Sequence, residues 1–240
     1  MEEIEFKNII SNDLSEISIN ISDEDAQKFF LYMKLLIEWN SKINLTAITE
    51  PKDIITKHFI DSLTISKYIK ENSRVVDCGT GAGFPGIPLA IIRKDCNFLL
   101  FDSLNKRICF LNEIIKELNL KNVIAIHGRA EEIAYDVKYR EKFDYAVSRA
   151  VANMSTLLEY LLPFCKKDGD AICMKGANIE EEIKNCKNTL NILKGKIEKI
   201  DNFILPKSDY SRNIIIVNKI GNVSSKYPRK QGKPAKEPLY

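Results

Sequence analysis

The chain has 240 residues, of which 45% are hydrophobic, and its formal net charge at pH 7 is +3. This length and composition suit one large domain, or one domain with a small appendage, and they argue against global disorder. The mild positive charge permits a nucleic-acid partner without arguing for one. No apolar run is long enough to span a bilayer, and the acidic start Met1–Glu5 is unlike a signal peptide. We therefore expect a cytoplasmic protein with no membrane partner.

The cysteines argue against a metal site. None forms a Cys-x-x-Cys pair, and none has a histidine at ligand spacing. Most lie inside apolar runs, so we expect small buried side chains with free thiols, which suit a reducing cytoplasm. The six cysteines are at positions 78, 96, 109, 165, 173 and 186.

The first part of the chain has a helical pattern from Ser22 to about Lys70. Ser22 followed by Asp25 is typical of a helix N-terminus, and apolar residues then recur at helical spacing. The segment 44–51 breaks this pattern, and a further helix is expected around His58. We expect residues 1–72 to form a small N-terminal helical cap.

After Asn72, short apolar runs alternate with longer amphipathic stretches. This alternation predicts an α/β fold with an open, mostly parallel sheet and helices on both faces, within residues 73–221. The last two strands have no helix between them, so we expect an antiparallel pair. The expected strands are Arg74–Asp77, Asn97–Asp102, Val123–Ile126, Phe143–Ser148, Ala171–Met174, Lys196–Phe203 and Ile214–Asn218. The expected helices include Gly86–Arg93, Asn105–Asn119, Ser155–Phe164 and Ile179–Leu193.

The final residues, 222–240, are basic, contain proline and have few apolar side chains. This composition predicts either a flexible tail or an arm that becomes ordered on its partner.

The segment Asp77–Gly86, with the sequence DCGTGAGFPG, lies between an apolar run and the start of a helix. A buried strand, a glycine-rich turn and a new helix have this pattern, which favours a nucleotide-like cofactor. Gly81 to Gly86 match the dinucleotide fingerprint G-x-G-x-x-G, which alone is a weak signal. Two details count against NAD: the glycine series begins earlier, at Gly79, and Asp77 lies where a pyrophosphate would bind. An NAD-dependent oxidoreductase stays an alternative.

A second expected strand ends in Asp102, about twenty residues further on. In nucleotide-binding α/β folds such a carboxylate accepts hydrogen bonds from ribose hydroxyls. Acids at two strand ends around a glycine turn suit S-adenosyl-L-methionine, which carries a ribose but no phosphate. The competing interpretation makes Asp102 the N-cap of the helix that starts near Asn105.

These motifs resemble those of the class I S-adenosylmethionine-dependent methyltransferases, which have a Rossmann-like fold. From about Phe29 to Leu239 the chain is similar to the bacterial 16S ribosomal RNA guanine-N7 methyltransferase family RsmG, also called glucose-inhibited division protein B. The motifs that carry the resemblance are Trp39–Thr46, His58–Ser62, Asp77–Pro88, Asp102–Arg107, Ser148-Arg149-Ala150, Met174-Lys175-Gly176 and the end from Tyr227 to Leu239. The resemblance implies methylation of N7 of a guanosine in 16S ribosomal RNA or the small ribosomal subunit.

The resemblance also implies site residues. Asp102 would contact the ribose, and Ala130 and Glu131 would flank the adenine. The cofactor site would further include Asp77, Gly79, Gly81, Phe84 and Arg149. The basic residues that the resemblance implicates in activity are Arg129, Arg149, Lys175 and Arg212. Ala82 replaces a proline that many relatives carry.

Methyl transfer to guanine N7 does not require a general base. Guanine N7 is unprotonated at neutral pH, so orientation of the two reactants is the main requirement. Two of these basic residues also have a purely structural interpretation: Arg149 could pair with Asp144 or Asp77, and Lys175 could be a solvated lysine at a strand end. His58 and Asp61 share a helical face, which is compatible with a simple intrahelical pair. A non-catalytic RNA-binding protein on the same fold is a further alternative.

Overall fold

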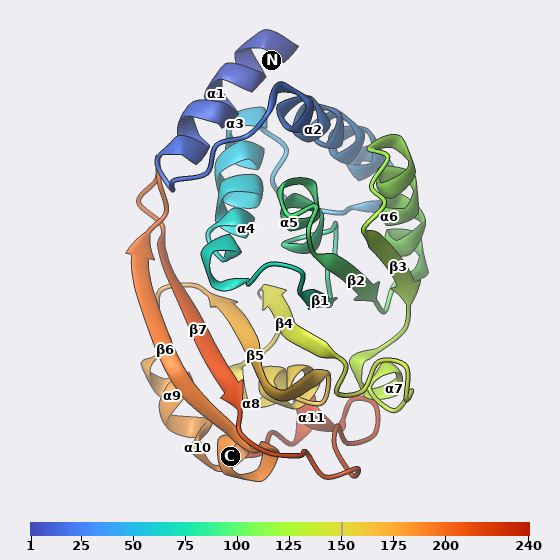
Figure 1. Ribbon diagram of the computed structural model, residues 1–240, viewed down its shortest axis with the longest axis vertical. Helices are drawn as coiled ribbons and strands as arrows, with labels where there is room; N and C mark the ends of the chain where they lie inside the picture. Colours follow the sequence, from blue (N-terminus) through green and yellow to red (C-terminus); the bar gives the residue numbers. More distant parts are fainter. Residues whose placement is uncertain (150) are drawn as a thin grey trace.

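The computed structural model describes residues 1–149 and 151–240, and a seven-stranded sheet forms its centre (Figure 1). The spatial order of the strands is β3-β2-β1-β4-β5-β7-β6. β1 to β5 run parallel, and β7 is antiparallel to both β5 and β6. The expected parallel sheet and its antiparallel last pair are therefore confirmed. The strands are β1 (Arg74–Cys78), β2 (Asn97–Asp102), β3 (Val123–His127), β4 (Phe143–Arg149), β5 (Cys165–Lys175), β6 (Gly195–Ile204) and β7 (Ser211–Lys219).

Helices cover both faces of the sheet, because alternate strand residues point to opposite sides. Val75 packs into a core shared with the N-terminal helices, α5 (Gly86–Ile92) and α6 (Asn105–Glu117). Val76 packs into the opposite core. The helices on that second side are α7 (Ala130–Ile133), α8 (Met154–Leu161), α9 (Glu180–Asn185), α10 (Lys187–Leu193) and α11 (Lys233–Lys236).

Three local expectations need correction. The stretch 179–193 forms two helices that meet at Cys186, without a glycine or proline to mark the break. β5 begins at Cys165 instead of Ala171, because a bulge lets its polar first half continue beside β4. α1 (Glu3–Ser15) precedes the region where we expected helices, and it packs mainly through buried residues spaced four apart: Phe6, Ile10 and Leu14.

The helical cap continues with α2 (Asp23–Ile43), which begins as expected. The Ser22 hydroxyl accepts a hydrogen bond from the Asp25 amide at 3.1 Å, and Asn44 ends the helix in a left-handed conformation. After the break come α3 (Pro51–Ile54), the π-helical turn η1 (Ile55–Ile60), α4 (Asp61–Leu63) and the 3-10 turn η2 (Ser66–Tyr68). The cap shares its core with α5 and α6, so its separation from the sheet domain at residue 72 stays a proposal.

The last 19 residues, 222–240, are packed against the sheet domain, and the expectation of a flexible or partner-dependent arm is wrong for this structure. Tyr227, Pro228 and Pro234 are buried, and Arg229 pairs with the fully buried Glu159 of α8. Long-range pairing thus orders a segment whose composition resembles a disordered tail. The division of the chain at residue 222 stays a proposal, and residues 222–240 are a C-terminal segment that is not a flexible tail.

Within the described ranges, no helix is both long enough and apolar enough to cross a bilayer.

Candidate active site

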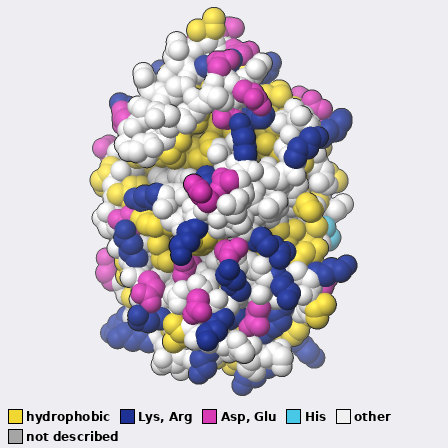
Figure 2. All heavy atoms as spheres, viewed as in Figure 1, with side chains coloured by type: hydrophobic (Ala, Val, Ile, Leu, Met, Phe, Trp, Pro, Cys, Tyr) yellow, Lys and Arg dark blue, Asp and Glu magenta, His cyan; other side chains and the backbone are white. Residues whose placement is uncertain are grey.

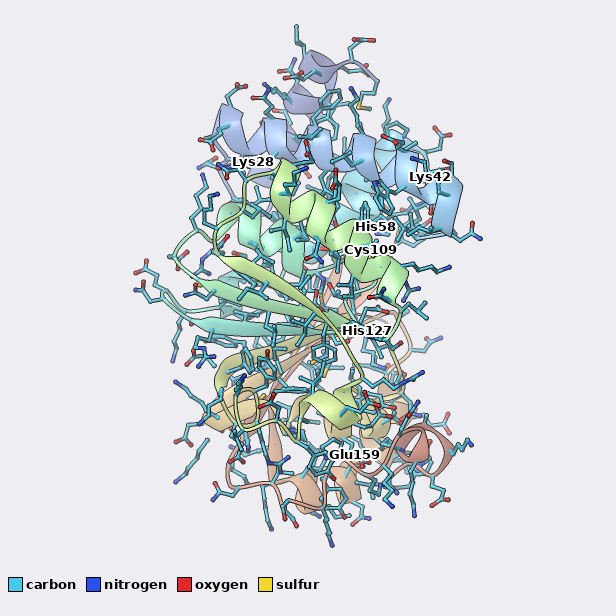
Figure 3. The ribbon with its side chains drawn as sticks, turned by 90° about the vertical axis from the view of Figure 1, so that its right-hand side faces the viewer. Lys28, Lys42, His58, Cys109, His127 and Glu159 are labelled. Carbon is cyan, nitrogen blue, oxygen red and sulfur yellow. The ribbon has the colours of Figure 1, made fainter. Side chains whose placement is uncertain are left out.

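A pocket of about 430 Å³ opens where β1, β2, β3 and β4 end. We call it the strand-end pocket. Its volume falls within the range of about 300–1,000 Å³ that is usual for small-molecule sites. Open α/β sheets bind ligands at this edge, where the strand order reverses; here the reversal lies between β1 and β4. Figure 3 shows His127, the last residue of β3, between His58 of the cap and Glu159 of α8. The strand-end pocket is lined by Cys78, Gly79, Phe101, Asp102, Ser103, Arg107, Gly128, Arg129, Ala130, Glu131, Arg149, Val151, Ala152, Thr156, Leu157, Tyr160 and Ala235.

The glycine turn lies at the base of this pocket. Gly79 has a φ of +69° and lines the pocket, and an added Cβ would lie 3.0 Å from Val151. Gly83 has a φ of +102°, and an added Cβ would lie 2.6 Å from the Tyr32 hydroxyl of the cap. That hydroxyl donates to the Ala82 carbonyl oxygen at 2.5 Å. The glycines therefore serve both the backbone conformation and the close approach of the cap.

Asp77 lies beneath the turn and is fully buried. Its Oδ2 accepts hydrogen bonds from Thr80 Oγ1 at 2.6 Å and from the Gly86 amide at 2.8 Å. Among the described residues, none donates to its other oxygen, Oδ1. The carboxylate thus holds the two ends of the turn together and does not face the strand-end pocket. This geometry does not support the expected direct contact with a cofactor.

The burial of Asp77 leads to a testable dependence of stability on pH. Burial raises the pKa of Asp77 from its usual value of 3.8 to about 7, against the opposing effect of its hydrogen bonds. The folded protein therefore binds this proton more tightly than the unfolded chain, so the stabilisation is complete below pH 3.8 and is lost as the pH rises through about 7. Between pH 3.8 and about 7, the wild-type free energy of unfolding should fall, relative to that of Asp77→Asn, by on the order of 1 kcal/mol per pH unit. Urea unfolding of both proteins across that range checks this; a constant difference would contradict it.

Asp102, at the end of β2, lines the pocket with a carboxylate that is 3% exposed. Its Oδ2 accepts from the Gly81 amide and from Arg107 Nη1, both at 3.0 Å, and its Oδ1 accepts from the Leu104 amide at 2.9 Å. A carboxylate has about four acceptor positions. Three are used here, so one is free for a ligand, and one of the three is used by the half-exposed Arg107. Leu104, not Asp102, is the N-cap of α6. Gly81 contributes by fixing the Asp102 carboxylate.

Two further predicted cofactor residues lie directly after β3. Ala130 and Glu131 line the pocket from α7, and the exposed Arg129 lines it from the position before that helix. Burial and the nearby Glu131 carboxylate raise the pKa of Tyr160 to about 12, so its hydroxyl stays protonated. Tyr160 lines the pocket from α8 and was not among the predicted residues.

Arg149, the last residue of β4, links the sheet to the cap. Its Nη1 donates to Asp61 Oδ2 at 3.0 Å, and its guanidinium lies over the Phe84 ring at 5.0 Å. The structural alternatives, pairing with Asp144 or Asp77, are not what the structure shows; Asp144 instead pairs with Lys166. Phe84 is not among the described residues that line the strand-end pocket, because its ring lies behind the Arg149 guanidinium and supports it.

His58 completes this arrangement. Its Nδ1 lies 3.1 Å from Arg149 Nη2, and its ring stacks on Phe84 with centroids 4.3 Å apart. A guanidinium has no acceptor, so Nδ1 must accept and Nε2 must carry the proton, which it donates to Thr46 Oγ1 at 2.9 Å. Burial and the Arg149 charge lower the pKa of His58 to about 3, which keeps this neutral tautomer. The simple His58–Asp61 pair is wrong: the two side chains share Arg149.

A second pocket, of about 580 Å³, lies between the cap and the ends of β4, β5 and β7. We call it the cap-side pocket. Arg149 lines both pockets. Arg212 also lies here, and its Nε donates to Asp61 Oδ1 at 2.9 Å, so that Asp61 bridges two arginines. The cap-side pocket is lined by Ile48, Lys57, His58, Asp61, Arg149, Met174, Lys175, Gly176, Tyr210 and Arg212.

Lys175 is not the solvated lysine of the alternative interpretation. Its side chain is 8% exposed, and its Nζ donates to the Ala152 carbonyl oxygen at 2.5 Å and to Glu182 at 2.7 Å. It therefore joins the end of β5 to the segment after β4. The motif residue Ala150 lies outside the described residues.

Asp61 is a second site residue, after Tyr160, that sequence reasoning missed. It belongs to the segment His58–Ser62, but nothing local indicates that its partners lie 88 and 151 residues away, in β4 and β7. The sequence also did not predict the π-helical turn that precedes Asp61, although such turns frequently occur at functional sites.

Comparison with known proteins identifies the family. A sequence model described as GidB, rRNA small subunit methyltransferase G, matches residues 25–215. The chain belongs to the rRNA small subunit methyltransferase G family. Ribosomal RNA small subunit methyltransferase G of Acetivibrio thermocellus is 50% identical over 239 residues, which cover 99% of this chain and 98% of the relative. The protein of that name from Alkaliphilus metalliredigens is 45% identical, over 98% of this chain and all of the relative.

Solved structures support the fold of this rRNA small subunit methyltransferase G family member. The crystal structure of M. jannaschii TYW2 in complex with AdoMet has a TM-score of 0.53 and 21% identity, over 67% of this chain and 75% of that one. M. capricolum TrmK in complex with S-adenosyl-homocysteine has a TM-score of 0.53 and 16% identity, over 68% of this chain and 69% of that one. The predicted class I methyltransferase fold is confirmed. Membership of the family favours methyl transfer over the oxidoreductase and the non-catalytic alternatives.

Proposed function

We propose that the protein uses S-adenosyl-L-methionine to methylate N7 of a guanosine in the 16S ribosomal RNA of the small ribosomal subunit. The observation that carries this proposal is the pair of neighbouring pockets that share Arg149. One contains a strand-end carboxylate suited to a ribose, and the other is bordered by basic side chains suited to RNA. Family membership supports the same reaction. Because its substrate would be ribosomal RNA, we infer a cytoplasmic location.

The strand-end pocket fits S-adenosyl-L-methionine better than a dinucleotide. Asp102 and Glu131 line it as two buried carboxylates, which disfavour phosphate groups but accept hydrogen bonds from hydroxyl and amino groups. We propose that Asp102 binds the ribose and that Ala130, Glu131 and Tyr160 border the adenine, with Gly79 at the base. When bound, the cofactor supplies an activated methyl group on a sulfonium centre.

The protein's own residues would then act by orientation. Guanine N7 carries a free lone pair at neutral pH, so the site needs no general base, and alignment of the reactants contributes about 7–11 kcal/mol. Methylation makes the base cationic, which opposes unpaired positive charge nearby. Asp61 lies between Arg149 and Arg212 and partly neutralises both. We propose that Asp61 positions these two arginines for the RNA without placing their full charge beside N7.

Binding calorimetry tests the cofactor assignment. The protein should bind S-adenosyl-L-methionine saturably with one site, and NAD should produce no heat of binding at the same concentrations. Saturable binding of NAD without a response to S-adenosyl-L-methionine would contradict the proposed function.

RNA binding should depend steeply on salt. On the face shown in Figure 2, basic and acidic side chains are interspersed over the half that carries α8 to α11, so we expect phosphate contacts mainly along the strand-end edge. Lys106 lies in the first turn of α6 at this edge, and Lys116 lies near the other end of the same helix. In a filter-binding salt series, Lys106→Gln should reduce the log–log slope by about 0.7, the value for one phosphate contact on a single strand. Lys116→Gln is the matched control and should leave the slope unchanged. Equal slopes in all three proteins would remove Lys106 from the RNA surface.

A further inference from the structure

The C-terminal segment, which we define as Lys226–Glu237, is fixed to α8 by one buried ion pair. Arg229 donates through Nε and Nη2 to the two Glu159 oxygens, with a shortest distance of 2.7 Å, and its amide donates to Oε1 at 2.7 Å. The Glu159 side chain has no exposed surface, and that of Arg229 is 18% exposed. A carboxylate with this burial is strongly destabilised when its partner is removed. The pair therefore holds the segment in one place.

The same segment reaches the strand-end pocket. The Gly232 amide donates to Glu131 Oε1 at 3.0 Å, and Thr156 Oγ1 donates to the Pro234 carbonyl oxygen at 2.9 Å. Ala235 lines the pocket together with Glu131 and Thr156. The segment thus touches side chains of both α7 and α8 that face the pocket.

The start of the segment is fixed as well. Arg140 donates to the carbonyl oxygens of Tyr227, Val223 and Ser224 at 2.9–3.2 Å. Tyr135 donates to the Pro228 carbonyl oxygen at 2.6 Å. These bonds order the backbone up to and including Pro228. The Lys230 side chain is exposed to solvent.

We propose that the C-terminal segment is a wall of the cofactor site and that the Arg229–Glu159 pair is a positioning element for S-adenosyl-L-methionine. This inference rests on the proposed function, because it assigns the cofactor to the strand-end pocket. The pair acts through Gly232, which orients the Glu131 carboxylate, and through Ala235, which narrows the pocket. Binding of the cofactor and ordering of the segment are then linked, and each stabilises the other.

Calorimetry on the full-length protein tests the positioning role. Arg229→Gln should weaken S-adenosyl-L-methionine binding by about tenfold or more, the loss that accompanies removal of a pocket-orienting bond. Lys230→Gln removes the same charge from the adjacent exposed position and should bind within about twofold of the wild type. Wild-type affinity in a folded Arg229→Gln protein would overturn the proposal.

Arg229→Gln leaves the buried Glu159 carboxylate without its partner, which destabilises the fold. A second pair of variants therefore tests the wall with this ion pair intact. Ala235→Trp places a large side chain at the exposed rim of the pocket and should change the affinity by about fivefold or more, whereas Lys236→Trp should stay within about twofold. Equal affinities of the two tryptophan variants would contradict a wall at Ala235.

Limited proteolysis gives an independent measurement on the wild type. Saturating S-adenosyl-L-methionine should slow tryptic cleavage after Lys230 by roughly fivefold or more, because bound cofactor stabilises the ordered segment. Cleavage after the exposed Lys207, in the β6–β7 connection, should not change. An unchanged rate at Lys230 would overturn the proposal. Failure of the wild type to bind S-adenosyl-L-methionine at all would instead overturn the proposed function.

Discussion

Asp102→Ala should weaken S-adenosyl-L-methionine binding by about 10- to 150-fold, the value of one charge-assisted hydrogen bond of about 1.5–3 kcal/mol. The reason is the position of the carboxylate: it lines the strand-end pocket, and the Gly81 amide and the Leu104 amide hold it there. Arg107 occupies one further acceptor position, from which a ribose hydroxyl can displace it because that side chain is 31% exposed. Calorimetry gives the affinity, and thermal unfolding gives the stability.

Asp95→Ala is the matched control for this prediction. Asp95 precedes β2 whereas Asp102 ends it, and each carboxylate accepts from one arginine and from at least one backbone amide. Both variants should therefore lose stability, but only Asp102→Ala should lose affinity. Equal affinities of the two variants would remove the ribose role of Asp102.

Asp61→Asn should lower kcat for RNA methylation by about 100-fold, the cost of a displacement of about 1 Å in a reacting geometry. An asparagine at this position accepts from one arginine and turns its amide group toward the other, so Arg149 and Arg212 can no longer be held together. The affinity for S-adenosyl-L-methionine should change by no more than about threefold, because Asp61 is not among the described residues that line the strand-end pocket. Arg149, which does line it, keeps its contacts with His58 and Phe84.

The control for Asp61 lies in the same helical region. Asp53 is 46% exposed and pairs with Lys57, so Asp53→Asn should leave kcat close to that of the wild type. Because a buried Arg–Asp–Arg group also contributes to stability, kcat is measured at a temperature where circular dichroism shows Asp61→Asn to be folded. A folded Asp61→Asn protein with wild-type kcat would show that the bridge has only a structural role.

The sheet is predictable from the sequence because its signals are local. Each strand from β1 to β4 is a short apolar run that ends near a polar residue, and the intervening helices are amphipathic. The first half of β5 lacks such an apolar run, since Lys166 and Lys167 lie in the strand and are exposed. The four-residue helix α7 is too short to have a detectable period.

The site is only partly predictable because several of its side chains act through distant partners. Asp102 and Gly79 follow from strand ends and glycine conformation, and the structure places both at the pocket. Asp77 carries the same local signal but lies beneath the pocket, because burial decides its contacts. Phe84 was implied only by the resemblance, and it lies behind Arg149 because it stacks there. Asp61 has its partners on two strands of the sheet, which no local pattern reveals.

The C-terminal segment shows the same limit. Its lysines and prolines predict a flexible tail or an arm that becomes ordered on its partner. Arg229 instead pairs with Glu159, which lies 70 residues earlier in the chain. Once that pair forms, Tyr227 and Pro234 are buried. The composition of the segment correctly predicts exposed lysines, but it does not predict the buried residues.

The most direct test of the proposed reaction is the mapping of N7-methylguanosine in 16S ribosomal RNA from cells with and without this protein. We predict that one N7-methylguanosine disappears when the protein is absent, that the wild-type chain restores it, and that Asp102→Ala restores it poorly. An identical N7-methylguanosine pattern in both kinds of cell would contradict the proposed function.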